Sequence, residues 1–124
     1  MTCLPFCCIS DQWSVASFTA AFRAAVDAVM QYGNAKPGLC TMVDALVPAV
    51  SGVEAALAAD ASLTAAKALS IAAASARSGA DSTKGVEAAA GRASYVETEV
   101  AKDVVDAGAE AVAQWLAGAS NSFA

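Results

Sequence analysis

Hydrophobic residues recur three and four positions apart in the first third of the chain. Between Trp13 and Tyr32 they fall at Val15, Phe18, Phe22, Val26, Val29 and Met30. This spacing predicts an amphipathic helix, because it places the apolar side chains on one face. Gly33 suits the left-handed position that ends a helix, and Pro37 prevents the helix from continuing. We therefore expect a helix up to Gly33 and a loop from Gly33 to Gly38.

A second helix is predicted after this loop. Thr41 can cap its N-terminus, and Asp44 places a carboxylate in the first turn, near the positive end of the helix dipole. Pro48 falls within the same segment, so a kink is expected if the helix runs on to about Ala59.

The third predicted helix is long. Asp60 or Ser62 can cap it, and helical spacing continues until the chain breaks at Gly91. Gly79 and Gly85 weaken such a helix by about 1 kcal/mol each relative to Ala. Two interpretations of these glycines stay open: the helix tolerates them, or they permit close contact with a neighbouring helix.

A last helix is predicted to begin at Asp106, after an irregular stretch from Glu97 to Val105. Asp106 is a good N-cap residue, and the apolar positions that follow recur with helical spacing. We expect a frayed tail from Gly118. The sequence thus predicts an all-α fold of about four up-and-down antiparallel helices.

The composition predicts a thin hydrophobic core. The chain has 124 residues, enough for one domain, and although 57% of them are hydrophobic, nearly half of these are Ala. Because each Ala buries only a methyl group, we expect the core to depend on the large side chains. These are Trp13, Phe18, Phe22, Met30, Tyr32, Leu46, Leu57, Leu63, Leu69, Ile71, Tyr95, Trp115 and Leu116. Exposed apolar surface that seeks a partner is a further expectation.

The charge pattern argues against several functions. A net charge of −5 and a pI near 4.4 disfavour nucleic-acid binding, which needs a basic surface. No apolar run reaches the roughly 18 residues needed to span a membrane. The cysteines are Cys3, Cys7, Cys8 and Cys40, and their spacing does not fit a zinc site. Reduced cysteines favour a cytoplasmic protein.

Common catalytic arrangements are also missing. The chain has no histidine, which excludes Ser-His-Asp and Cys-His nucleophiles, and no Gly-rich loop followed by Lys and Ser or Thr. Two carboxylate pairs, Glu97 with Glu99 and Asp103 with Asp106, are compatible with a metal ion, but such pairs more often form a solvated surface.

The remaining candidate is a cluster of loop ends. In an up-and-down bundle, the loop after the first helix and the loop after the third lie at the same end. This places Gly33, the helix start at Thr41 and Met42, Arg92 and the helix start at Asp106 close together. Two helix N-termini and a guanidinium suit a polyphosphate, and Met42 offers an apolar contact for a base.

Three stretches in this cluster carry a resemblance to a known family. They are Thr-Met-Val-Asp-Ala-Leu at 41–46, Gly-Arg-Ala-Ser-Tyr at 91–95 and Asp-Ala-Gly-Ala at 106–109. In order and spacing they resemble the nucleotide-binding L domain of dihydroxyacetone (glycerone) kinases. That domain is an antiparallel helical barrel with ATP or ADP at one end, and residues 13–118 resemble its C-terminal half. Residues 1–12 and 119–124 are then tails outside the match, the first of them expected to be disordered.

The resemblance implies a set of nucleotide contacts. It places Gly33, Thr41, Met42, Arg92, Asp106, Ala107 and Gly108 at the nucleotide. The sequence also differs from the family pattern. Leu39 and Cys40 occupy positions where the family has an acidic and a basic residue, and Ala107 replaces a proline. The family's magnesium ligands, aspartates in a Gly-Asp-Gly-Asp loop, have no counterpart here. Its histidine-bearing substrate domain is missing as well.

The resemblance therefore predicts the nucleotide-binding part of an ATP-dependent dihydroxyacetone kinase, which transfers phosphate to a triose in glycerol and dihydroxyacetone metabolism. Because the magnesium loop is missing, we expect catalysis by this chain alone to be severely impaired and nucleotide binding to be retained, and activity requires a substrate domain or a second copy as partner. A phosphocarrier that recharges bound ADP is an equally compatible donor. The alternative is a non-catalytic, truncated helical module that binds a partner through its exposed apolar face. A third interpretation is an unrelated Ala-rich bundle.

Overall fold

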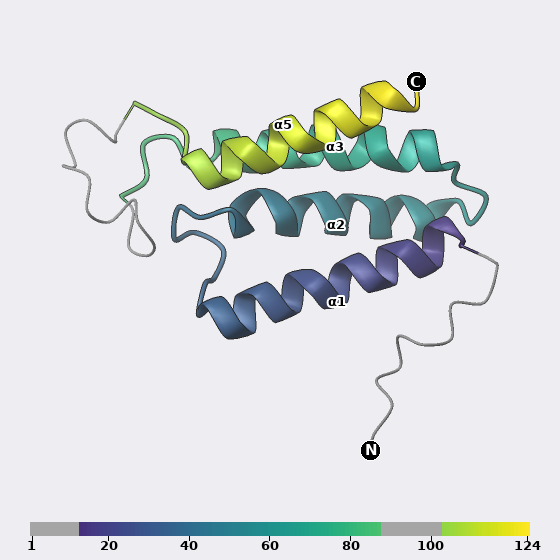
Figure 1. Ribbon diagram of the computed structural model, residues 1–124, viewed down its shortest axis with the longest axis horizontal. Helices are drawn as coiled ribbons and strands as arrows, with labels where there is room; N and C mark the ends of the chain where they lie inside the picture. Colours follow the sequence, from purple (N-terminus) through teal and green to yellow (C-terminus); the bar gives the residue numbers. More distant parts are fainter. Residues whose placement is uncertain (1–12, 88–102) are drawn as a thin grey trace, which may run out of the picture.

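The computed structural model describes residues 13–87 and 103–124, and these form α-helices joined by turns. The helices are α1 (Val15–Gly33), α2 (Val43–Ala59), α3 (Ala65–Asp81) and α5 (Ala107–Ser122). Successive helices run in opposite directions, so the bundle is up-and-down (Figure 1). The predicted all-α fold is confirmed for the described residues.

Local sequence explains both ends of α1. Ser14 and Ser17 form a capping box, in which each side chain bonds the backbone of the other residue. At the other end, Asn34 takes the left-handed conformation, with φ 48°, and its N–H donates to the carbonyl of Met30. The helix end was predicted correctly, but Gly33 is its last helical residue and Asn34 occupies the left-handed position. A short polar side chain tolerates that conformation better than most.

The predicted start of α3 is wrong. Thr64 caps this helix, with its hydroxyl accepting from the N–H of Lys67. Asp60 and Ser62 instead form the preceding turn, where the Asp60 carboxylate accepts from both the N–H and the hydroxyl of Ser62. Asp and Ser favour such local bonds outside helices as much as they favour caps, so the pattern alone did not separate the two uses.

The predicted length of α3 is also wrong, because the helix ends at Asp81 and does not continue towards Gly91. The Ser82 hydroxyl donates to the carbonyl of Gly79, which satisfies one of the last helical acceptors. Gly85 then adopts φ 82°, a conformation that is not helical. Hydrophobic spacing continues past Asp81, but the backbone turns away.

The last helix extends further than predicted. α5 runs on to Ser122, whereas a frayed tail was expected from Gly118. Gly118 is exposed and nothing lies within 4 Å of its missing Cβ, so the helix passes through it at only the usual cost of glycine. The Ser122 hydroxyl donates to the carbonyl of Gly118 and closes the final turn.

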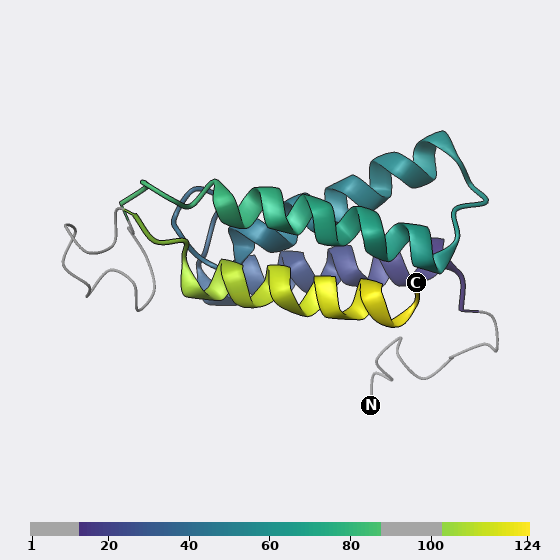
Figure 2. The same cartoon turned by 90° about the horizontal axis from the view of Figure 1, so that it is seen from above.

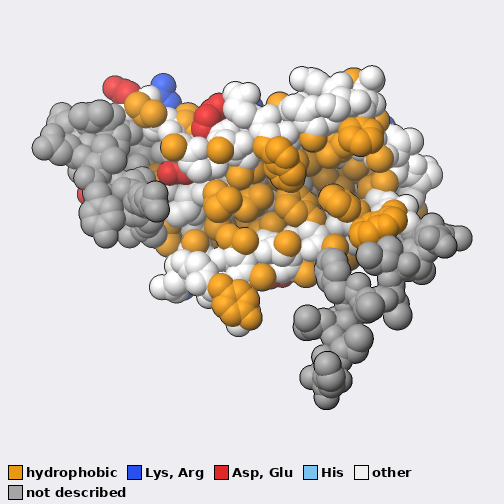
Figure 3. Space-filling model, viewed as in Figure 1, with side chains coloured by type: hydrophobic (Ala, Val, Ile, Leu, Met, Phe, Trp, Pro, Cys, Tyr) orange, Lys and Arg blue, Asp and Glu red, His pale blue; other side chains and the backbone are white. Residues whose placement is uncertain are grey.

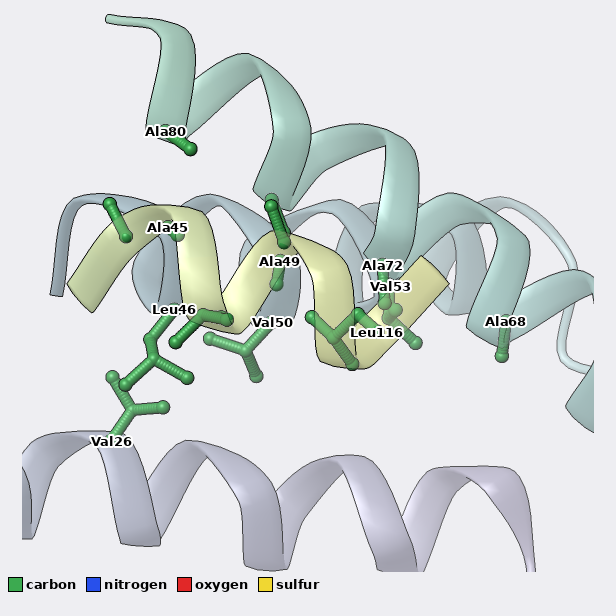
Figure 4. Packing of buried hydrophobic residues seen from close by; sticks show 14 of the residues in the cluster. Val26, Ala45, Leu46, Ala49, Val50, Val53, Ala68, Ala72, Ala80 and Leu116 are labelled. Carbon is green, nitrogen blue, oxygen red and sulfur yellow. The ribbon is translucent and has the colours of Figure 1, made fainter. Parts of the chain in front are cut away.

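The core is built from Ala and Val more than from large side chains. Val26, Leu46, Val50 and Leu116 meet beside alanines of α2 and α3 (Figure 4). The predicted core members Leu46, Leu63 and Leu116 are buried. Others are exposed, which corrects the prediction: Trp13 by 64%, Phe18 by 58%, Tyr32 by 85% and Trp115 by 63%. Tyr95 lies outside the described residues.

Close packing of α2 on α3 explains why small residues fill the core. A Cβ on Gly79 would overlap the carbonyl oxygen of Asp44 and lie 2.9 Å from Cγ of Pro48. A Cβ on Gly52 would overlap the hydroxyl of Ser75. Both glycines therefore let the two helices approach, which decides the open question about Gly79 in favour of close contact. Bulky side chains have no space between helices at this separation.

One face of the bundle is open. α1 packs mainly on α2, and α5 packs mainly on α3. Both lie on the same side of the α2–α3 pair, and no described helix covers that side between them (Figure 1 and Figure 2). A groove of about 510 Å³ runs there, and apolar side chains dominate the same face in Figure 3. Its lining includes Trp13, Phe18, Phe22, Leu69 and Phe123. Within residues 13–87 and 103–124, no helix combines the length and the hydropathy needed to cross a membrane.

Candidate functional site

Two helix starts meet at the end of the bundle where α1 stops. The loop that follows α1 leads into α2, and the chain that leads into α5 reaches the same end, on the left of Figure 1. This is the convergence that the up-and-down topology predicted. Of the predicted site residues, Thr41, Met42, Asp106, Ala107 and Gly108 lie at these two helix starts.

The start of α2 is held by a carboxylate from its own first turn. Asp44 is 8% exposed, and its side chain accepts hydrogen bonds from the N–H of Thr41, at 2.9 Å, and from the N–H of Gly38. Thr41 in turn accepts from the N–H of Val43 at 3.3 Å. Asp44 therefore fixes the loop, and its negative charge interacts favourably with the positive end of the helix dipole. Met42 stands at the helix boundary and is 43% exposed.

The start of α5 is held from both sides. The carboxylate of Asp106 accepts from the N–H of Ala109 at 2.8 Å, which confirms Asp106 as the predicted N-cap. Its backbone N–H donates to the hydroxyl of Thr83 at 2.9 Å. The first turn of α5 is thus fixed to the turn that follows α3. The first N–H groups of a helix have no partner within the helix itself.

The two helix starts touch at Gly108. A Cβ on this glycine would lie 3.3 Å from the backbone nitrogen of Met42 and 3.1 Å from the carboxylate of Asp106. Both distances are tighter than usual for a Cβ, so the missing side chain is what lets the first turn of α5 approach Met42, the N-cap residue of α2. The N-termini of two helices are consequently side by side.

Two residues that sequence reasoning did not place in the site connect its loops. Cys40 is buried, and its thiol lies 3.3 Å from the carbonyl oxygen of Val86 and 3.6 Å from that of Thr83. Burial raises the pKa of the Cys40 thiol, and the nearby carboxylates of Asp44 and Asp106 raise it further. The thiol therefore stays protonated and can donate. Its separation from Thr83 by 43 positions left no signal in the sequence.

An ion-pair network supports the site from the side. The guanidinium of Arg77 on α3 makes two hydrogen bonds to the carboxylate of Glu110 in the first turn of α5, at 2.9 and 2.6 Å, and also pairs with Asp81. The bond to Arg77, supported by a second from Gln114, lowers the pKa of Glu110 to about 2. The hydrogen bonds from Arg77 to Glu110 and to Asp81 raise the pKa of Arg77 above its usual value. The network attaches the first turn of α5 to the last part of α3.

The remaining predicted contacts are less closely assembled. Gly33 ends α1 at the same end of the bundle, but nothing lies within 4 Å of its missing Cβ. Arg92 lies outside the described residues. The same holds for the cysteine cluster near the N-terminus, Cys3, Cys7 and Cys8, and for the carboxylate pair Glu97 and Glu99.

The described carboxylates do not make a metal centre. Asp44 and Asp106 are the acidic side chains closest to the two helix starts, and both already accept backbone N–H groups. Over residues 13–87 and 103–124, His, Cys, Asp and Glu form no group of three or more that fits a metal ion. A magnesium ion therefore finds no ligand set among these residues.

Comparison with known proteins gives consistent results. The family model described as the DAK2 domain matches residues 8–121. A protein of Solanum lycopersicum, provisionally named 3,4-dihydroxy-2-butanone kinase, is 42% identical over 100 residues. The aligned stretch covers 81% of this chain but only 16% of that relative. Since the family model spans nearly all of the described helices, the chain belongs to the DAK2 domain family, the family of the dihydroxyacetone kinases.

Proposed function

We propose that this chain is the nucleotide-binding part of a dihydroxyacetone (glycerone) kinase and holds the phosphates of ATP or ADP between the starts of α2 and α5. Membership in the DAK2 domain family supports a kinase-related role. The motifs at Thr41–Leu46 and Asp106–Ala109, which carry the resemblance to the nucleotide-binding domain, form these two helix starts.

The observation that carries the proposal is the contact at Gly108. It brings two helix N-termini together where a side chain on residue 108 would separate them. Each N-terminus presents backbone N–H groups and the positive end of a helix dipole, an arrangement that binds phosphate. Met42 is 43% exposed beside them, and in this proposal its apolar side chain contacts the base.

The chemistry assigned to these residues is binding and orientation. In phosphoryl transfer, the protein contributes mainly by positioning the phosphates and stabilising their charge. The chain spans about a sixth of the relative it matches. In this proposal the phosphate acceptor is a triose, held by a partner domain or a second copy. The donor is ATP, or ADP recharged by a phosphocarrier, and the expected compartment is the cytoplasm.

Nucleotide titration tests the proposal. We expect the wild-type chain to bind ADP and ATP in isothermal titration calorimetry. Gly108→Ala should weaken that binding by about tenfold or more, since its methyl group fills the contact between the helix starts. Gly118→Ala is the matched control on the same helix: its methyl group meets open space, so the affinity should not change.

Two results would contradict the proposal. One is a folded wild-type chain that binds neither nucleotide at millimolar concentration, with or without Mg²⁺. The other is a Gly108→Ala variant that binds as tightly as Gly118→Ala.

The groove favours a second candidate function, a module that binds a partner through its apolar face. Trp13, Phe18 and Phe123 are each more than half exposed and line the same groove. Monomeric proteins rarely expose a continuous apolar patch of this kind. This function does not exclude nucleotide binding, because the groove and the helix starts lie in different parts of the molecule.

A further inference from the structure

Thr83 connects the end of α3 to the start of α5. It lies in the turn after α3 and is 4% exposed. Its hydroxyl donates to the carbonyl of Ala80 at 2.7 Å and accepts from the N–H of Asp106 at 2.9 Å. Both hydrogen-bonding functions of the side chain are therefore used, one within the turn and one across to α5.

The backbone of Thr83 extends the junction to α2. Its carbonyl accepts the N–H of Val86 at 3.2 Å and faces the buried thiol of Cys40, in the loop that precedes Thr41. One residue thus contacts the segments that lead into both helix starts. Cys40 holds φ 54°, a conformation that is strained for a side chain of this type, which shows how tightly this loop is constrained.

We propose that Thr83 is a positioning residue for nucleotide binding: its hydroxyl fixes the start of α5 at the distance from the start of α2 that the phosphates require. The inference rests on the proposed nucleotide-binding function. Thr83 is buried and does not itself touch the ligand. It acts through Asp106, whose cap orients the first turn of α5, and through Gly108, which that turn places against Met42.

The role depends on the hydroxyl and not on the size of the side chain. Valine has nearly the shape of threonine but cannot accept the Asp106 N–H. In Thr83→Val, the backbone N–H of residue 83 still donates to the carbonyl of Ala80, at 3.0 Å. The main loss is therefore the hydrogen bond that links the turn to α5. Serine keeps the hydroxyl and loses a methyl group. The two substitutions therefore separate hydrogen bonding from packing.

The experiment measures the affinity for ADP and the thermal unfolding midpoint of the same variants. Thr83→Val should weaken ADP binding by about tenfold, whereas Thr83→Ser should remain within about twofold of wild type. Thr19→Val is the matched control. Thr19 is also buried, at 5% exposure, and its hydroxyl donates to the carbonyl of Val15 within α1. This variant also loses a buried hydroxyl, yet it should leave the affinity unchanged.

The possible outcomes are separable. If wild type binds ADP and Thr83→Val binds equally well, the positioning role is wrong while the proposed function stands. If Thr19→Val weakens binding as much as Thr83→Val does, the effect is a general loss of stability and the inference fails. If wild type binds no nucleotide, the proposed function fails and this inference fails with it.

Amide hydrogen exchange gives a readout that needs no ligand. Thr83→Val should speed exchange at Asp106 and in the first turn of α5, and Thr19→Val should not. If Thr83→Val does not fold, Cys40→Ala tests the same junction from its other side, because it removes the thiol that faces the Thr83 carbonyl. Tight ADP binding by Cys40→Ala with unchanged exchange near Asp106 would then overturn the inference.

Discussion

Gly79 shows how a single missing side chain sets the packing of this protein. It lies on α3 against the first turn of α2, beside the carbonyl of Asp44. Pro48 has no N–H, so it cannot donate to this carbonyl as a residue four positions later in a helix normally would. The backbone of α3 comes close at the very point where the helical ladder of α2 is interrupted.

Replacement of Gly79 by Ala should therefore destabilise the fold, by about 1 to 3 kcal/mol, the usual range for overpacking. The new methyl group overlaps a backbone oxygen, which cannot rotate away as a side chain would. The midpoint of urea unfolding, followed by circular dichroism, measures the effect. Gly118→Ala is the control, and it should stabilise by up to about 1 kcal/mol because it replaces an exposed helical glycine. Equal stability of the two variants would be inconsistent with this packing.

Residue identity alone predicted part of the candidate site. Asp106 as a cap and Asp44 in the first turn of α2 follow from the preference of carboxylates for helix N-termini, and both are confirmed. Thr83 and Cys40 were not identified, since their partners lie 23 and 43 positions away in the sequence. Such bonds exist only after the helices have packed.

At the scale of elements, each helix is held to a neighbour by one arginine network. Arg23 on α1 makes two hydrogen bonds to the carboxylate of Glu54 on α2, and Arg77 joins α3 to α5. The bond to Arg23 lowers the pKa of Glu54, as that to Arg77 lowers the pKa of Glu110. Two-point contacts of this kind give direction as well as attraction, so they help to fix how neighbouring helices align.

The pH dependence of stability should reveal the link between α3 and α5. The pKa of Glu110 is about 2 in the folded protein against an ordinary value of 4.5, so its ionised form stabilises the fold above pH 4.5. That contribution is lost as the pH falls from 4.5 through 2. Both partners are more than a third exposed, which screens the interaction and keeps the effect small.

Urea unfolding of wild type and Glu110→Gln at a series of pH values measures this contribution. The variant should be less stable than wild type at pH 7, and the difference should shrink between pH 4.5 and pH 2. Asp27→Asn, which removes an exposed carboxylate from α1, controls for the change in net charge. A difference that stays constant from pH 7 to pH 2 would show that Arg77 and Glu110 do not form a stabilising pair.

Helix boundaries followed the sequence where a cap or a breaker was decisive. α1 ends at Gly33 and α2 at Ala59, as predicted. α3 was predicted too long, because hydrophobic spacing continues beyond Asp81 although the helix does not. Periodicity reports which residues can share a face, but it does not report whether a turn competes for the same backbone groups.

At the scale of the whole molecule, the open face is the main consequence of the helix arrangement. Residues of α1 and α3 line most of the groove, and Phe123 joins them just after the end of α5. Trp13, Phe18 and Phe123 in this lining are each more than half exposed. The chain as a whole is acidic, but the residues that line the groove carry no charge. Two copies can therefore meet at the groove without burying a charged side chain. We therefore expect the groove to bind a second copy of this chain.

We expect the chain to self-associate as its concentration is raised, and Phe18→Ser to reduce that association. Phe18 is 58% exposed in the groove, so its replacement should not destabilise the helix bundle itself. Sedimentation velocity over a range of concentrations measures the effect. Tyr32→Ser removes an aromatic residue that is 85% exposed on the same helix but does not line the groove, and it should leave association unchanged. A wild-type chain that stays monomeric, or a Phe18→Ser variant that associates equally well, would exclude this surface as the interface.

The sequence by itself determined the helical class, the start of α5 at Asp106 and the motifs that point to the DAK2 domain family. These features are local, since propensity, capping and short motifs act within a few residues. Only the tertiary structure decided which residues are buried. Trp13 and Trp115 lie on the surface while Ala45, Ala49 and Ala76 are fully buried. The reason is the close approach of α2 and α3 at Gly52 and Gly79, which leaves space for methyl groups but not for rings. The same packing brings Gly108 to Met42, and so assembles two ordinary helix starts into one candidate site.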